Sequence, residues 1–344
     1  RWWEALVWTR KSTPRAVLIH DMRVNKLSFG FPQSEMIRYY GYPCEEYEVT
    51  TKDGYILGVF RIPSGRNMQN TGKKPAVLLH HGTFADCTYW ISNLPRNSLG
   101  FILADVGYDV WLGNSRGNTW SSKHKTLKPC QKEFWQFSFH EIGIYDLPAE
   151  LDFIMNKTGQ KDVYYVGHSE GSTAGFVAFS TYPELAQRVK VFFALGPVAT
   201  ITYATSPFVK FARLPQPLIR VWPTTLLCAT LGKLCARIFC FIAGGSIQNL
   251  NTSRTDAFVA HYPAGTSVQN TIHWHQRIST PIAVWSGGQD KFAGPKDIAK
   301  LLSQITNLFY YKHFPEWGHL DFVWGLDATE RMYRKIIELM TKYA

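Results

Sequence analysis

Residues 167–171 read Gly-His-Ser-Glu-Gly, a G-x-S-x-G motif. The motif follows an apolar run at 163–166 and precedes small residues at 172–175, as expected where a strand turns sharply into a helix. The two glycines leave room for neighbouring backbone at such a turn, which exposes the serine hydroxyl above the sheet. The sequence therefore predicts that Ser169 is a catalytic nucleophile.

A second G-x-S-x-G motif, Gly-Asn-Ser-Arg-Gly, stands at residues 113–117 and also follows a strand-like run. The residues after it, at 118–122, are typical of a loop and not of a packed helix. A serine nucleophile in this motif requires the helix, because the helix N-terminus faces the charge that develops in the reaction. We therefore interpret Ser115 as part of a structural turn.

A serine hydroxyl is a weak nucleophile unless a base and an orienting acid accompany it. In this class of site the acid and then the histidine follow later strands. Asp290 follows the strand predicted at 282–285, whereas Asp297 stands at a helix start, where acidic residues are common for dipole reasons. His319 follows the strand predicted at 308–314. Asp290 and His319 are the predicted acid and base.

Two polar residues lie close to His319 in the sequence. His313 ends the preceding strand, and Asp321 comes two residues after His319. The order of strand, loop, histidine and helix favours His319 over His313 as the base. We interpret Asp321 as structural.

The transition state also needs donors for the oxyanion. His81 and Gly82 follow a compact apolar strand at 76–80, in the position of the turn that supplies one backbone N–H group. The predicted donors are the backbone N–H groups of Thr83 and Glu170. One such donor contributes about 3 kcal/mol of transition-state stabilisation.

Short apolar runs alternate with longer helical patterns, which predicts an α/β fold with a mostly parallel central sheet flanked by helices. The alternation stops between residues 198 and 280, a stretch rich in Pro, Cys, Thr and aromatic residues. We interpret it as a helical cap inserted over the C-terminal edge of the sheet, where ligands bind in open α/β folds. The expected organisation is an atypical N-terminal segment at 1–33, a first core part at 34–197, the cap at 198–280 and a second core part at 281–344.

The composition suits a globular domain, since 45% of the 344 residues are hydrophobic and 18% are charged. The formal net charge is +11, but the basic residues are scattered and no basic run alternates with stacking aromatics. Nucleic acid is therefore not an expected partner, whereas an anionic lipid surface fits the charge. Residues 1–33 contain neither a signal-peptide pattern nor a membrane span. No C-x-x-C pair is present, so a structural zinc site is not expected. No other metal and no cofactor are predicted.

Three of the six cysteines cluster between residues 228 and 240, and N-x-[ST] sequons occur at Asn156 and Asn251. The sequons are predicted glycosylation sites. Together with the clustered cysteines, they indicate a secretory compartment, where a disulfide could persist.

Four longer segments resemble the acid lipases, the family of lysosomal acid lipase and gastric lipase. They are Trp-Ile-Ser-Asn-Leu-Pro at 90–95, the run from Gly-Tyr-Asp-Val-Trp to Gly-Asn-Thr-Trp at 107–120, Pro-Ala-Gly-Thr-Ser-Val-Gln-Asn at 263–270 and His-Leu-Asp-Phe at 319–322. The likeness runs from about Met36 to the C-terminus.

This resemblance implies the α/β-hydrolase fold and hydrolysis of triacylglycerols and cholesteryl esters at acid pH, in the lysosome or after secretion. It places the catalytic triad on Ser169, Asp290 and His319. It also implies a cap disulfide, for which Cys228 and Cys235 are the best match. A local turn with free thiols is the open alternative.

The sequence departs from the family in three places. The family has Gln where Glu170 stands and Leu where Thr83 stands, and the cap is several tens of residues shorter here, with gaps near residues 222–223 and between 276 and 277. A shortened cap keeps two alternatives to a neutral-lipid lipase open. One is a general carboxylesterase with an open site, and the other is a catalytically weak lipid-binding paralogue.

Overall fold

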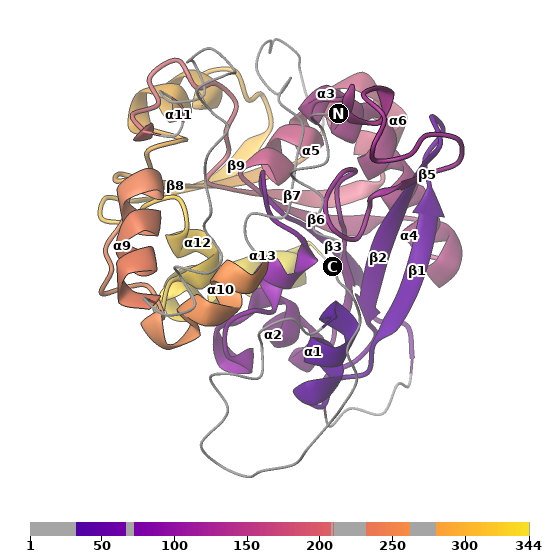
Figure 1. Cartoon of the computed structure of the whole chain (residues 1–344), viewed down its shortest axis with the longest axis horizontal. Coiled ribbons are helices and arrows are strands. Elements are labelled where there is room, and N and C mark those ends of the chain that lie inside the picture. Colours follow the sequence, from indigo (N-terminus) through magenta and orange to yellow (C-terminus); the bar gives the residue numbers. More distant parts are fainter. Residues whose placement is uncertain (1–31, 67–71, 208, 210–231, 262–279, 344) are drawn as a thin grey trace.

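A computed structural model describes residues 32–66, 72–207, 209, 232–261 and 280–343. In this part of the chain a nine-stranded sheet crosses the centre of the molecule (Figure 1). Its order is β1-β2-β4-β3-β6-β7-β8-β9, and β5 pairs with β2. The strands are β1 (Glu45–Thr50), β2 (Tyr55–Ile62), β3 (Ala76–His80), β4 (Asp109–Leu112), β5 (Lys123–His124), β6 (Val163–His168), β7 (Val189–Leu195), β8 (Ile282–Gly287) and β9 (Leu308–Phe314).

The strand order decides where a site can form. Strands β1 and β2 make an antiparallel hairpin, β2 runs antiparallel to β4, and all pairings from β4 across to β9 are parallel. After β3 the chain adds β4 on one side of the central pair β3–β6, and after β6 it adds β7 on the other side. The loops after β3 and β6 therefore leave the sheet in opposite directions, and such a switch point opens a crevice at the carboxyl ends of the strands.

Helices cover both faces of the sheet because strand side chains alternate between the faces. Val77 and Leu79 of β3 join a core with α1, α2, α12 and α13, whereas Ala76 and Leu78 join a second core with α4, α5 and α11. The sheet is thus buried on both sides, as expected for parallel strands. The helices are α1 (Gln33–Tyr39), α2 (Leu99–Asp105), α3 (Phe139–Glu141), α4 (Leu147–Thr158), α5 (Glu170–Thr181), α6 (Pro183–Ala186), α9 (Gly232–Ala243), α10 (Thr255–His261), α11 (Pro295–Leu302), α12 (Asp321–Trp324) and α13 (Arg334–Lys342).

The predicted architecture of a mostly parallel sheet flanked by helices is confirmed. A π-helical turn at Ile142–Asp146 leads directly into α4. The π turn ends at Asp146, which is buried and accepts a hydrogen bond from Arg116 in the loop after β4. Such π turns are frequent near functional sites.

Within the stretch predicted as a cap, the structure describes α9, a 3₁₀ turn at Thr252–Arg254 and α10. Figure 1 shows α9 and α10 in orange beside the yellow α12. Aromatic side chains of α9 and α10 pack against Trp324 of α12. The Trp324 ring stacks on Phe258 of α10 at 4.3 Å between ring centroids, and its centroid lies 5.9 Å from that of Phe239 on α9. Almost all of the predicted N-terminal segment lies outside the described residues. In the described ranges, no helix has the length and apolar character that crossing a membrane requires.

Candidate active site

Ser169 stands between β6 and α5 with φ 55° and ψ −115°, a strained conformation for a residue with a side chain. The turn is tight. A Cβ at position 167 would lie 2.6 Å from the backbone of Gly171, and a Cβ at position 171 would lie 2.4 Å from the carbonyl oxygen of His80. Both positions therefore require glycine, which explains the G-x-S-x-G spacing.

The structure brings Ser169, His319 and Asp290 together from three separate loops. His319 Nε2 lies 2.7 Å from Ser169 Oγ, and His319 Nδ1 lies 2.8 Å from Asp290 Oδ2. All three side chains are buried. The geometry lets the imidazole accept the serine proton at Nε2 while Nδ1–H donates to the carboxylate.

Backbone groups fix the acid. Asp290 Oδ1 accepts the N–H groups of Phe292 and Ala293, both at 2.8 Å, which leaves Oδ2 for His319. The centroid of the Phe292 ring lies 5.0 Å from that of the His319 imidazole, with 50° between the ring planes. Asp290 is therefore held in one orientation before substrate binds.

His168, the residue before the nucleophile, contacts the backbone of the base. Burial holds the pKa of its imidazole well below the usual value of 6.5, so the ring is neutral. Its Nε2 then donates to the carbonyl oxygen of His319 at 2.8 Å, and Nδ1 accepts from the Tyr89 hydroxyl at 3.1 Å. The sequence does not predict this role, because a residue in the variable position of the motif carries no signal of its own.

The competing residues lie elsewhere. Asp297 is in the first turn of α11, where it accepts from the Thr200 hydroxyl and, at 3.0 Å, from the backbone of Tyr203. His313 Nδ1 lies 2.8 Å from Ser286 Oγ, inside the pairing of β8 with β9. Neither of these contacts involves the cluster of Ser169, His319 and Asp290.

Asp321 begins α12 directly after the base. Its Oδ2 accepts the backbone N–H of Gly318 at 2.6 Å, and its Oδ1 accepts Asn249 Nδ2 at 2.8 Å. Burial raises its pKa to about 6, opposed by these two hydrogen bonds and reinforced by the nearby carboxylates of Asp327 and Asp290. The two bonds tie the turn before His319 to the chain that follows α9.

The turn after β3 meets the nucleophile. A Cβ at position 82 would lie only 2.9 Å from the Ser169 Cβ, so Gly82 lets the two backbones approach. In the described residues, the only side-chain-bearing positions with positive φ are Ser169 and Phe84, one in each of these turns. The Thr83 hydroxyl donates to the Glu170 carboxylate and links the two predicted oxyanion donors. Strain of this kind is typical of pre-organised sites.

The second motif supports that turn. His81 is buried, which lowers the pKa of its ring, and Nδ1 donates to the carbonyl oxygen of Gly82 at 2.8 Å. Its Nε2 accepts the backbone N–H of Ser115 at 3.2 Å, and the Asn118 amide lies 3.2 Å from the same atom. This arrangement fits the interpretation of Ser115 as part of a structural turn.

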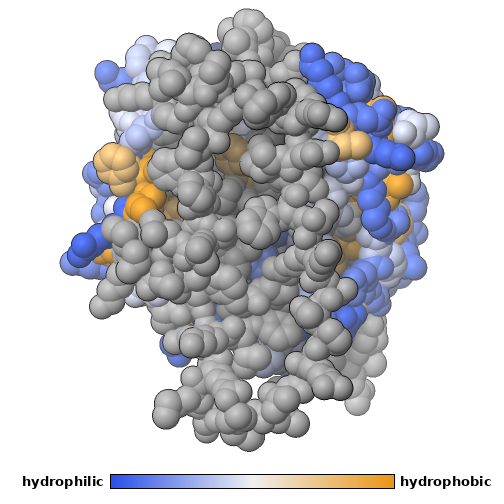
Figure 2. All heavy atoms as spheres, viewed as in Figure 1, coloured by the Kyte–Doolittle hydropathy of each residue, from blue (hydrophilic) through white to orange (hydrophobic). Residues whose placement is uncertain are grey.

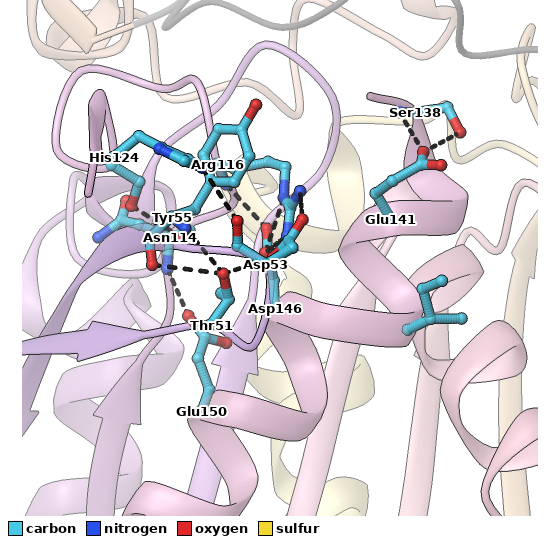
Figure 3. A network of polar contacts seen from close by, with 12 residues as sticks. Thr51, Asp53, Tyr55, Asn114, Arg116, His124, Ser138, Glu141, Asp146 and Glu150 are labelled. Atoms are coloured by element: carbon cyan, nitrogen blue, oxygen red, sulfur yellow. Dashed lines mark hydrogen bonds and ion pairs between the residues drawn. The ribbon is translucent and has the colours of Figure 1, made fainter. Parts of the chain in front are cut away.

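Figure 3 shows how Arg116 anchors the same loop. Its guanidinium is 1% exposed and donates to Asp146 at 2.8 Å and to Asp53 at 2.6 and 2.9 Å. The group also lies over the Tyr55 ring, 4.0 Å from its centroid. A single cation therefore joins the turn between β1 and β2, the loop after β4 and the π turn before α4.

A buried acid completes the network in Figure 3. Glu150 on α4 is 0% exposed, and burial raises the pKa of its carboxyl well above 4.5, which favours its protonated form. Its Oε1 accepts the backbone N–H of Asn114 at 3.1 Å, and Oε2 lies 3.6 Å from Nε2 of a buried His80. Burial lowers the pKa of His80 to about 3, which favours its neutral imidazole.

Comparisons with known proteins identify the family. A family model described as alpha/beta hydrolase fold matches residues 75–326, and one described as partial alpha/beta-hydrolase lipase region matches residues 33–94. Human lysosomal acid lipase/cholesteryl ester hydrolase is 50% identical over 90% of this chain and 90% of its own length. Bovine gastric triacylglycerol lipase is 46% identical over 90% of this chain and 91% of its own length. The chain belongs to the acid lipase family of α/β hydrolases.

Other likenesses agree with this membership. Mouse lipase member M is 49% identical over 89% of the chain and 85% of its own length. Among solved structures, naproxen esterase from Bacillus subtilis has a TM-score of 0.60 at 14% identity and covers 93% of this chain and 100% of its own. That second likeness shows the fold alone. The comparisons thus confirm that this chain resembles the acid lipases and that it belongs to the predicted class of ester hydrolases.

The two predicted glycosylation sites, Asn156 and Asn251, differ in how exposed their side chains are. Asn156 is exposed on α4, whereas Asn251 is 8% exposed and its Nδ2, the atom that would carry a glycan, donates to Asn93 at 2.8 Å. A glycan on Asn251 would have to break that buried contact.

Cys228 lies outside the described residues, so its pairing with Cys235 stays a prediction. Nowhere in the described ranges do three potential metal ligands gather.

Proposed function

We propose that this acid lipase hydrolyses the carboxylic esters of neutral lipids, triacylglycerols and cholesteryl esters, through an acyl-enzyme on Ser169. The observation that carries the proposal is the position of His319, within hydrogen-bonding distance of both Ser169 and Asp290. The substrate class follows from relatives named for cholesteryl ester and triacylglycerol hydrolysis, at 50% and 46% identity.

The proposed reaction uses groups that are already in place. His319 Nε2 takes the Ser169 proton as Oγ attacks the ester carbonyl, and the N–H groups of Thr83 and Glu170 bind the oxyanion. The imidazolium then protonates the departing alcohol. Water attacks the acyl-enzyme with His319 again as base, which releases the fatty acid and restores the hydroxyl. Asp290 keeps the imidazole in the required tautomer throughout.

Features of the surface support action at a lipid interface. Phe241 of α9 is 62% exposed, and the chain carries a formal net charge of +11. Figure 2 shows hydrophobic residues beside hydrophilic ones on the left of the molecule, the side where Figure 1 places α9. The Lys291 ammonium lies 5.2 Å from the centroid of the exposed Phe241 ring, and an aromatic ring beside a cation favours contact with an anionic lipid surface. We propose that residues 198–280 form the cap over the site, with a disulfide between Cys228 and Cys235.

We also propose a lysosomal or secreted location, in line with the name of the human relative and with the exposed sequon at Asn156. Asn156 is the glycosylation site that the folded protein can carry without losing a buried contact. Peptide mapping of the protein from mammalian cells, before and after glycosidase treatment, tests this: we expect Asn156 to be modified and Asn251 to be unmodified.

The main experiment compares Ser169→Ala with Ser115→Ala and the parent chain. We expect fluorophosphonate labelling and hydrolysis of long-chain triacylglycerol and cholesteryl ester to vanish in Ser169→Ala only. Undiminished labelling of Ser169→Ala would refute the assignment. Ser115→Ala controls for the other G-x-S-x-G motif, since its hydroxyl has no proposed part in the chemistry.

The predicted shortening of the cap favours a second candidate, a general carboxylesterase with the same triad. A preference for soluble short-chain esters over emulsified long-chain esters would support it. A third outcome, lipid binding without turnover or labelling, would indicate a catalytically weak lipid-binding paralogue.

A further inference from the structure

The chain that leaves α9 packs directly on the turn that carries the base. Gly244 and Gly245 have φ of 84° and 88°, values that favour glycine. A Cβ at position 318 would lie 2.1 Å from the carbonyl carbon of Gly244, and a Cβ at position 245 would lie 2.4 Å from Asp321 Oδ2. The two turns therefore touch backbone to backbone, with the Asp321 carboxylate between them.

The last residue of α9 adds hydrogen bonds to this contact. The carbonyl oxygen of Ala243 accepts the N–H of His319 at 3.1 Å and the N–H of Lys291 at 3.2 Å. Lys291 directly follows Asp290. One carbonyl group thus holds the backbone of both the acid loop and the base loop, so the end of α9 belongs to the structure that supports the triad.

Asp321 holds the other side of the same turn. It bonds the N–H of Gly318 and the amide of Asn249, as described above. Asn249 in turn accepts the N–H of Leu326 on its carbonyl oxygen at 2.8 Å, so it is itself fixed to the end of α12. Gly318 has no side chain with which to hold its position. The buried carboxylate supplies the fixed acceptor that the turn before His319 needs.

We propose that Asp321 is a positioning residue, whose two carboxylate oxygens clamp the His319 turn to the segment 244–250 and keep the imidazole in line with Ser169 and Asp290. The proposal rests on the proposed function, because it concerns the same triad. Catalytic groups must be held to within about 0.5 Å, and a displacement of about 1 Å can reduce the rate about 100-fold. A loose turn therefore lowers the rate per site without altering the surface that binds the ester.

The test measures kcat and KM for a soluble short-chain ester in Asp321→Asn and Asn249→Ala. Each rate is divided by the concentration of active sites, titrated with a fluorophosphonate, so that loss of folded protein does not count as loss of rate. Asp297→Asn is the matched control. It is also a buried aspartate that accepts two hydrogen bonds, but it has no contact with the triad.

We expect kcat per titrated site to fall about tenfold in Asp321→Asn and about threefold in Asn249→Ala, with KM nearly unchanged, and to stay at the parent value in Asp297→Asn. The double variant should lose no more than Asp321→Asn alone, because both changes open the same clamp. A purely structural role predicts fewer titrated sites but a normal kcat for each, and that result overturns the proposal.

Two other outcomes are also decisive. If Asp321→Asn does not fold, Asn249→Ala decides alone, since it removes only one of the two bonds, and an unchanged kcat per site overturns the clamp. If the parent chain is not labelled at Ser169, the proposed function fails. If instead the parent chain is labelled and active but Asp321→Asn leaves kcat per titrated site unchanged, only the proposal for Asp321 fails.

Discussion

His168 donates from Nε2 to the carbonyl oxygen of His319 at 2.8 Å, so the residue before the nucleophile holds the backbone of the base. The two rings lie 4.7 Å apart. Because burial keeps the pKa of His168 well below 6.5, its ring stays neutral in mildly acidic solution and the donor arrangement does not change. The nucleophile turn and the base loop are thus coupled by a contact that is insensitive to moderate acidity.

The first prediction concerns this contact. His168→Phe keeps a ring of similar shape but removes the donor, which leaves a buried carbonyl oxygen without its partner. We expect kcat on a soluble ester to fall about tenfold, because the base loop loses a fixed anchor. Steady-state kinetics with active-site titration measures this. His313→Phe, at the end of β9, is the control, and equal losses in both variants would contradict the prediction.

The second prediction concerns the charge next to the oxyanion. Glu170 supplies a proposed backbone donor, and its side chain accepts from Thr83. A carboxylate near a developing oxyanion opposes it, whereas an amide keeps an acceptor for Thr83 without the charge. Glu170→Gln should therefore raise kcat at pH 7 by about threefold. A pH series of kcat for the parent and the variant checks this, and a fall in kcat at neutral pH would show that the carboxylate assists the reaction.

The sequence indicates the three residues that the structure brings together, Ser169, Asp290 and His319, because each of them follows a strand with a clear pattern. Strand β3 has the predicted bounds, since its residues are buried on both faces of the sheet. The sequence does not predict the two-residue strand β5, because Lys123 and His124 are both polar and form no alternating pattern. The residues that hold the triad were also missed. His168 contacts a residue 151 positions away, and nothing local in a sequence signals a partner at that distance.

Asp321 is a second residue whose distant partner the sequence does not reveal. Its place two residues after His319 indicated a structural role, and the two hydrogen bonds agree with that. The sequence could not show that one partner, Asn249, comes from the stretch predicted as the cap. Only the packing of Gly245 against Gly318 reveals that this stretch supports the turn before His319.

The third prediction tests Arg116. Removing its charge leaves Asp146, which is 0% exposed, without the cation that offsets its burial. Arg116→Met should lower the free energy of unfolding by about 3 to 5 kcal/mol, as is typical when one partner of a buried ion pair is lost. Urea denaturation measures the change. Adding Asp146→Asn to Arg116→Met should recover part of the loss, and a further loss of the same size would show that the two residues act independently.

The fourth prediction links buried acids to stability in acid. The native pKa of Glu150 lies well above 4.5, whereas the unfolded chain titrates near the ordinary value for glutamate, about 4.3. Below that pH the native and the unfolded state both hold the proton, so Glu150 does not make the free energy of unfolding depend on pH. Above it the unfolded state releases the proton while the native state keeps it, so native stability falls by up to about 1.4 kcal/mol per pH unit.

Glu150→Gln removes this slope, because the amide mimics the protonated acid and keeps an acceptor for Asn114. We expect parent and variant to have similar free energies of unfolding at pH 4, and the variant to be the more stable at pH 7. Urea denaturation at several pH values between these limits measures the difference. Asp152→Asn, an exposed position on the same helix, controls for removal of a carboxylate as such. Parallel stability curves for the parent chain and Glu150→Gln would mean that the native Glu150 is ionised, and the buried network would then contribute nothing to a preference for acid.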